Sequence, residues 1–244
     1  MAVRVAVPVA GMATRAPVAV PGVTGAARVG QVPVPAAPPM LAELHVGSKH
    51  QCTLRVALGA GADISIHARP YDRHALSALS LPACSATPHR AGGWIGSVDR
   101  GSSVNCPVLT IVPHGSGTHT ETVGHVLPGT VVLGRDIAFP PALMAAVVLS
   151  VAPATLDAPL AGYPASATGD AVITAEALQV AFAAVAHAAA VSPTRVHEAL
   201  SGGAAVVRTL PNSDAKQLAQ WTGTNPPFFA PDAISWLLAA GARQ

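Results

Sequence analysis

The stretch that decides the fold is "ITAEALQVAFAAVAHAAAV", residues 173–191. Alanine and unbranched side chains dominate it, and these residues have high intrinsic helix propensity. Thr174 stands just before the alanine-rich body, where a threonine hydroxyl can accept a hydrogen bond from a free N–H group of the first turn. The stretch therefore predicts a long helix that begins after Thr174.

Shorter elements are predicted on both sides of this helix. "LMAAVVLSVA" (143–152) is apolar and short, which favours a buried strand over a helix, and "AAVVRTL" (204–210) favours another strand. "APDAISWLLAAGAR" (230–243) predicts a helix, because Pro231 suits a first turn, Asp232 complements the helix dipole and Gly241 suits the end. Strands that alternate with helices indicate an α/β or α+β single domain with a mixed sheet and flanking helices.

The first half of the chain predicts strands only. "LAELHVG" (41–47) and "QCTLRVALG" (51–59) alternate loosely around a short polar turn, which is typical of a β-hairpin. "ADISIHA" (62–68) predicts a further strand, and residues 80–103, with their prolines, glycines and serines, predict an irregular loop. "CPVLTIVPH" (106–114) predicts a strand that leads into a histidine-rich segment.

Composition excludes several classes of partner. The formal net charge is +2, and the 14 lysines and arginines form no stripe interleaved with the few aromatic residues, so we expect no nucleic-acid partner. Pro, Gly or a charge interrupts every apolar run before it could cross a bilayer, which predicts a soluble, cytoplasmic protein without a membrane partner. Three widely spaced cysteines without a CxxC pair favour a reducing compartment and buried thiols.

The N-terminal residues 1–39 differ from the rest. They carry prolines at short intervals and three arginines, and no acidic residue occurs before Glu43. Proline at this density predicts a disordered extension, with the folded domain at 40–244. A true start at Met40 is a second interpretation, and an organelle-targeting segment is a third.

Chemistry-bearing side chains gather in "PHGSGTHTETVGHV", residues 113–126. On an extended segment His119, Glu121 and His125 would point to one side, because side chains repeat every two residues. The glycines after His114 can bend the backbone and return that imidazole to the others. Two imidazoles and a carboxylate suit Zn²⁺, with Mn²⁺ and Fe²⁺ as alternatives, and a further histidine could move protons. A polar loop of hydrogen-bonded imidazoles is the structural alternative.

These residues resemble the signature HxGTHxDxPxH of the cyclase family of metal-dependent hydrolases, which includes kynurenine formamidase and isatin hydrolase. "GTH" (117–119) matches it, Glu121 falls on the Asp, and His125 falls on the final His. "DISI" (63–66) and "RTLPN" (208–212), followed by "TGTNPPFFAPDAISWLLAAGAR" (222–243), are also similar to family segments, so the resemblance runs from about Met40 to Gln244.

The resemblance implies a swivelling β/β/α-like fold and hydrolysis of an amide or lactam C–N bond, as in an arylformamidase, by a metal-activated water molecule. It implies His119 and Glu121 as metal ligands, Zn²⁺ or Mn²⁺ as the cofactor, and His125 as the catalytic histidine. His114 takes the role of the first ligand if the glycine turn absorbs one residue, because the family's first His aligns with Gly115. A small-molecule amide is the expected substrate and a homo-oligomer the expected assembly.

Departures from the signature leave a second interpretation open. Val123 replaces the family's proline, and family members continue after "GAR" with a core strand and further His and Glu residues. This predicts a C-terminal truncation, and a truncated or divergent non-catalytic family member is the alternative function. We expect His187 and His197 on helix surfaces. For Trp94, Trp221 and Phe228 we expect core packing rather than an aromatic pocket.

Overall fold

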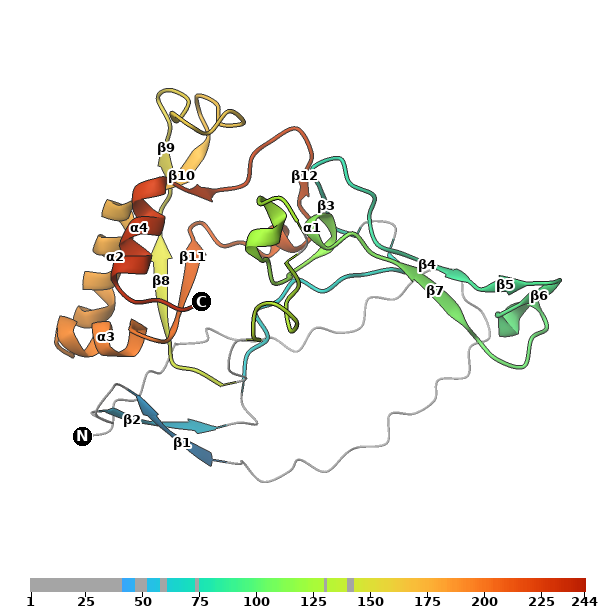
Figure 1. Ribbon diagram of the computed structural model, residues 1–244, viewed down its shortest axis with the longest axis horizontal. Coiled ribbons are helices and arrows are strands. Elements are labelled where there is room, and N and C mark those ends of the chain that lie inside the picture. The colour runs from blue at the N-terminus through green and yellow to red at the C-terminus, as the bar shows by residue number, and fades with distance from the viewer. Residues whose placement is uncertain (1–40, 47–51, 58–60, 73–74, 130, 140–142) are drawn as a thin grey trace. The chain divides into compact units, whose positions relative to one another are not determined.

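The computed structural model describes residues 41–46, 52–57, 61–72, 75–129, 131–139 and 143–244. The chain divides into two compact units, Met1–Ala62 and Asp63–Gln244, which are considered separately (Figure 1). The prediction for residues 1–39 lies outside the described residues.

The first unit holds the predicted hairpin. Strand β1 (Leu41–Val46) pairs antiparallel with β2 (Cys52–Ala57), with Leu41 opposite Ala57 and Val46 opposite Cys52. Glu43 and Arg55 face each other across the two strands, and the guanidinium Nε lies 3.0 Å from a carboxylate oxygen. Cross-strand pairing of this kind fixes the register of a hairpin.

The second unit contains the hydrophobic core. Strand β8 (Ala146–Val151) pairs parallel with β11 (Ala204–Thr209). Helices α2 (Ala175–Ala188), α3 (Pro193–Leu200) and α4 (Pro231–Ala239) lie together beside these strands (Figure 1). The side chains of Leu149, Leu178 and Leu200 are fully buried between them. The predicted strands and helices of this region are confirmed.

Local signals fix the helix ends as the sequence predicts. The Thr174 hydroxyl accepts a hydrogen bond from the backbone N–H of Ala177 at 3.2 Å, which caps α2. Pro231 opens α4, and Gly241 follows its end with a φ of +83°. Asp232 also accepts a hydrogen bond from the Ala175 N–H, so the first turn of α4 is tied to the first turn of α2.

Smaller sheets complete the unit. β13 (Phe228–Phe229), β10 (Ala171–Ile173) and β9 (Ala154–Thr155) form a mixed sheet in that order. β3 (Ser77–Ala78) pairs parallel with β12 (Gln220–Trp221), which follows the 3-10 helix η3 (Asp214–Leu218). Helices and strands therefore mix as in the α/β class.

Residues 80–103 are not the irregular loop that the sequence predicts. β4 (Ser85–Pro88) pairs antiparallel with β7 (Pro107–Thr110), and β5 (Arg90–Ala91) pairs with β6 (Trp94–Ile95), ahead of the 3-10 helix η1 (Val98–Arg100). The prediction is wrong because the partner of β4 lies about twenty residues along the chain. The prolines and glycines within 80–103 indicate turns, but they carry no information about a partner strand that lies outside this segment.

The predicted strand at 62–68 is also wrong, since no strand occurs there. The segment instead makes two hydrogen bonds to Thr118: the Ile66 N–H donates to the Thr118 hydroxyl at 2.8 Å, and the Thr118 N–H donates to the Ile66 carbonyl at 3.0 Å.

Two predictions that side chains are buried are also wrong. Cys84 is buried but Cys106 is exposed, and Trp94 is 41% exposed instead of packing in the core.

Within the described part of the chain, no single helix has both the length and the apolar character to cross a membrane. Helices α2 and α3 together have enough length and apolar character, but the chain bends by 115° between them.

Candidate metal centre

Two short helical turns carry the histidine-rich segment. α1 (Pro113–Ser116) is a single turn that begins with Pro113 and holds His114. η2 (Val123–His125) is a 3-10 turn whose N-cap is Thr122, with the Thr122 hydroxyl accepting from the Gly124 N–H at 3.3 Å. The segment is therefore not extended over its whole length, because a proline at the first position and a threonine cap each favour a helical turn.

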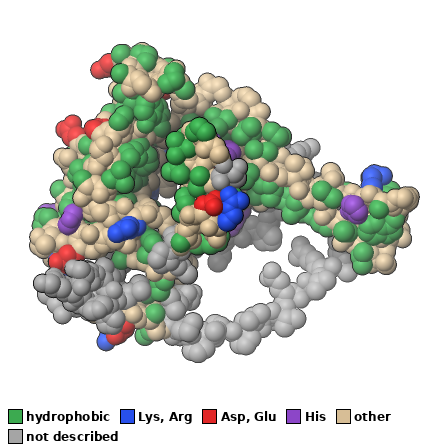
Figure 2. Space-filling view, viewed as in Figure 1, with side chains coloured by type: hydrophobic (Ala, Val, Ile, Leu, Met, Phe, Trp, Pro, Cys, Tyr) green, Lys and Arg blue, Asp and Glu red, His purple; other side chains and the backbone are tan. Residues whose placement is uncertain are grey.

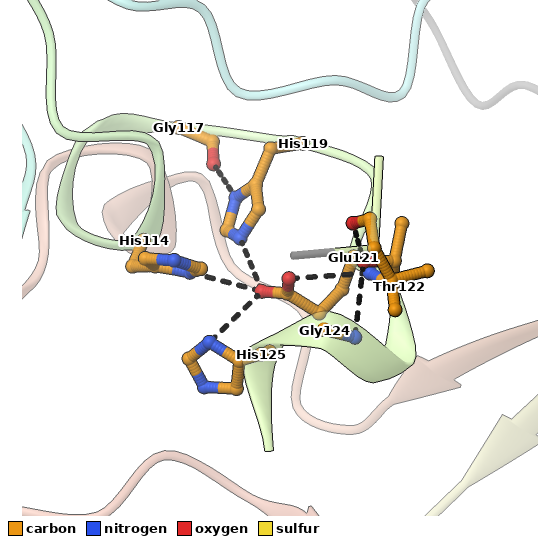
Figure 3. A network of polar contacts seen from close by, with 8 residues as sticks. His114, Gly117, His119, Glu121, Thr122, Gly124 and His125 are labelled. Carbon is orange, nitrogen blue, oxygen red and sulfur yellow. Dashed lines mark hydrogen bonds and ion pairs between the residues drawn. The ribbon is translucent and has the colours of Figure 1, made fainter. Parts of the chain in front are cut away.

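These turns bring three imidazoles around one carboxylate. The Glu121 Oε2 lies 2.9 Å from His114 Nδ1, 3.5 Å from His119 Nε2 and 3.7 Å from His125 Nδ1 (Figure 3). The His114 and His119 rings meet edge to face, with their centroids 5.1 Å apart. The four side chains thus share one centre.

Three of these residues can hold a metal ion. His114, His119 and Glu121 each offer one ligand atom, and the three atoms all lie within 4.8 Å of one another. Two imidazole nitrogens and one carboxylate oxygen match the ligand preference of Zn²⁺, and Mn²⁺ accepts the same donors. A set of three protein ligands leaves a coordination position for water or substrate. The residues present therefore fit a catalytic divalent ion.

The tautomer of His119 suits this role. Its Nδ1 lies 2.9 Å from the Gly117 carbonyl oxygen, which can only accept a hydrogen bond (Figure 3). The ring proton of the neutral imidazole therefore sits on Nδ1, and the lone pair of Nε2 is directed toward Glu121. A backbone carbonyl that orients a ligand imidazole in this way is a recurrent feature of metal sites.

Two glycines allow the backbone to take this path. A Cβ on Gly117, whose φ is +154°, would lie 2.7 Å from the Ile66 carbonyl oxygen. A Cβ on Gly115 would lie 2.9 Å from the Cβ of Leu81, so α1 packs closely on the residues that follow β3. Only glycine permits both approaches.

The carboxylate of Glu121 is held in its charged form. Desolvation is the largest single influence and raises its pKa, but the Thr122 N–H and the nearby His125, His114 and His119 together outweigh it, so the pKa lies below its ordinary value. The Thr122 N–H donates to Oε1 at 3.2 Å, which leaves Oε2 for the imidazoles. The side chains remain partly open to solvent, from 31% for His119 to 49% for His125.

Sequence reasoning missed Thr122. Its hydroxyl caps η2 and also donates to the Val131 carbonyl at 3.2 Å, so it ties the turn that carries His125 to the following loop. A threonine directly before a short run of residues is a common N-cap, and this pattern could have indicated the role of Thr122 in the sequence.

The prediction for two other histidines is confirmed. His187 on α2 and His197 on α3 are both exposed on helix surfaces.

Comparison with known proteins identifies the family. The family model described as "Putative cyclase" matches residues 54–244. The chain therefore belongs to the cyclase family, and this membership supports a coarse, hydrolase-like relationship. None of the curated proteins and none of the solved structures matches the chain.

Proposed function

We propose that this protein is a metal-dependent hydrolase that cleaves the C–N bond of an amide or lactam, in the manner of a kynurenine formamidase (arylformamidase). The observation that carries the proposal is the convergence of His114, His119 and Glu121 within 4.8 Å. The family relationship supports the same reaction class.

Each residue of the cluster has a distinct role in the proposal. His119 presents Nε2 because its Nδ1 proton is held by Gly117, and His114 and Glu121 present Nδ1 and Oε2 toward the same point. A divalent ion, Zn²⁺ or Mn²⁺, supplies Lewis acidity that polarises a carbonyl and acidifies a water molecule. The Thr122 N–H keeps the Glu121 carboxylate oriented by occupying its second oxygen.

His125 is assigned to proton transfer. Its ring centroid lies 4.5 Å from that of His114, but it stands outside the set of three ligand atoms. An imidazole can accept a proton at one nitrogen and donate at the other, so His125 can take a proton from the attacking water and return it to the leaving amine. Its half-exposed position leaves it accessible to a small-molecule substrate.

The test combines metal analysis with an amidase assay on N-formyl aromatic amines. We expect about one ion per chain in the unaltered protein and loss of that ion in His119→Ala. His125→Ala should keep the ion and lower the rate by about 10²- to 10⁴-fold. His197→Ala, an exposed histidine on α3, is the matched control and should change neither quantity.

The outcomes separate the two interpretations of the cluster. Metal content that is unaffected by His119→Ala would rule out the proposed centre. A stoichiometric ion that depends on His119, without hydrolysis of any formamide or lactam, would instead support a non-catalytic family member that retains the site.

A further inference from the structure

A tight turn directly after β3 has a backbone conformation that its residues disfavour. Leu79 and Ser80 both have a φ of +57°. The Leu81 N–H donates to the Ala78 carbonyl at 2.9 Å, and the Ser77 hydroxyl donates to the Leu81 carbonyl, also at 2.9 Å. Positive φ at both central positions is typical of a type I′ turn, which strongly prefers glycine and asparagine because a side chain crowds the backbone there. A leucine and a serine keep this conformation only where their surroundings stabilise it.

Thr222 supplies a stabilising contact from a segment that is distant in the sequence. Its hydroxyl accepts a hydrogen bond from the Ser80 N–H at 3.2 Å, across a separation of 142 residues. This N–H belongs to the peptide group between Leu79 and Ser80, so the bond orients the group that joins the two positive-φ residues. The parallel pairing of β3 with β12, in which Ala78 lies opposite Trp221, brings Thr222 to this position.

The same turn is the surface on which α1 packs. A Cβ on Gly115 would lie 2.9 Å from the Cβ of Leu81 and 3.3 Å from the Ala78 carbonyl oxygen. Gly115 is buried and directly follows His114, one of the three residues that can hold a metal ion. β12, β3 and α1 lie next to one another (Figure 1). The position of α1, and with it that of His114, therefore depends on the form of the turn.

Few charged groups are available to hold these segments together. Residues 77–81 ("SALSL") and 220–224 ("QWTGT") contain no charged side chain, and charged residues make up only 11% of the chain. Figure 2 shows a face of the molecule on which hydrophobic and uncharged side chains predominate. Hydrogen bonds and close packing therefore have to supply the positioning of the turn.

We propose that Thr222 is a positioning residue for the metal ligand His114. The Thr222 hydroxyl holds the turn 78–81 in its positive-φ form, and the turn holds α1 through its contact with Gly115. Without this hydroxyl the turn can relax toward negative φ, which is the favoured region for residues with a side chain. That change would withdraw the turn from α1 and let His114 move relative to Glu121. The inference rests on the metal centre of the proposed function, but not on the reaction catalysed there.

Thr222→Val tests this role, because it keeps the size of the side chain and removes the hydroxyl. The Gly115 N–H donates to the Val112 carbonyl at 3.0 Å, and its hydrogen exchange in the metal-free protein, measured by NMR, should become about two- to tenfold faster. The dissociation constant for Zn²⁺, measured by calorimetric titration, should rise by about the same factor, which corresponds to the loss of one ordinary hydrogen bond. Leu81→Ala, which removes the side chain next to Gly115, should act in the same direction and serves if Thr222→Val fails to fold.

Matched variants separate positioning from a general loss of stability. Thr222→Ser retains the hydroxyl and should behave like the unaltered protein. Thr224→Val makes the same substitution at an exposed threonine two residues further along and should change neither quantity. In the Thr222→Val background, Ser80→Gly should move both quantities back toward their original values, because glycine adopts a positive φ without strain. Ser80→Ala in the same background retains a side chain and should give no such recovery.

The outcomes distinguish this inference from the proposed function. Gly115 exchange that is unchanged in Thr222→Val would overturn the positioning role, as would effects that Thr222→Ser or Thr224→Val reproduces. Equal recovery by Ser80→Gly and Ser80→Ala would count against it, and so would faster exchange with an unaltered affinity in a protein that binds Zn²⁺. If the unaltered protein binds neither Zn²⁺ nor Mn²⁺, the proposed function fails, whereas the Gly115 exchange rate still decides whether Thr222 positions α1.

Discussion

The C-terminal core and the candidate metal centre are built in opposite ways. In the core, Leu149 and Leu200 are fully buried between regular strands and helices. In the metal centre, the four clustered side chains are 31–49% exposed and lie on single turns and the loop between them. Burial of apolar surface stabilises the first region, whereas a few backbone contacts and hydrogen bonds position the second. Stability and chemistry should therefore respond to different substitutions.

The largest expected effect on stability lies in the core. Leu149→Ala should lower the free energy of unfolding by about 3–4 kcal/mol, because it removes a fully buried side chain from the middle of β8 and leaves a cavity. Urea denaturation measures the loss. Leu238→Ala, an exposed leucine on α4, should cost no more than about 0.5 kcal/mol. Equal losses in the two variants would contradict the assignment of the core.

The second effect falls on the backbone of the metal centre. Gly117→Ala should cost about 1–3 kcal/mol and weaken metal binding, since the new Cβ would meet the Ile66 carbonyl and displace the Gly117 carbonyl from His119. Calorimetric metal titration and urea denaturation measure the two losses. Gly129→Ala is the control, because Gly129 has a φ of +90° but open space around its Cβ position. Equal metal affinity of the two variants would show that the close approach of Gly117 to the Ile66 carbonyl does not position the metal ligands.

A smaller effect is expected at the cap of η2. Thr122→Ala should cost about 1 kcal/mol, because it removes the hydroxyl that bonds to the Gly124 N–H and the Val131 carbonyl. Thermal unfolding measures this loss, with Thr120→Ala, an exposed threonine of the same segment, as the control. An identical loss for both variants would show that the cap does not stabilise the turn that carries His125.

The smallest effect concerns pH. The pKa of Glu121 in the folded protein lies below its ordinary value of 4.5, so its charged form stabilises the metal-free protein above that value. This stabilisation should disappear as the pH falls through the folded-state pKa. The difference in unfolding free energy between the unaltered protein and Glu121→Gln should therefore shrink toward zero in acid. Glu198→Gln, a helical glutamate outside the cluster, controls for the loss of a surface carboxylate, and a difference that grew in acid would contradict the sign.

The sequence predicts the core well because its signals are local. The alanine-rich body after Thr174 and the proline that opens α4 fix helix ends through contacts within one turn, and the structure keeps both. The ribbon at 85–110 and the missing strand at 62–68 could not be predicted in the same way. β-pairing depends on a partner distant in sequence, and Ile66 finds a threonine side chain and backbone instead of a strand.

For the candidate site, the sequence by itself determined which residues gather: three histidines and a glutamate in one segment, with glycines between them. Their spacing did not determine the geometry, because an extended chain would have placed His114 on the opposite side. Only the tertiary structure decided that α1 and η2 turn His114 and His125 toward Glu121, and that the Gly117 carbonyl sets the proton of His119. The physical reason is that composition and periodicity fix local preferences, whereas the approach of Gly115 to Leu81 and of Thr118 to Ile66 involves residues brought together only by folding.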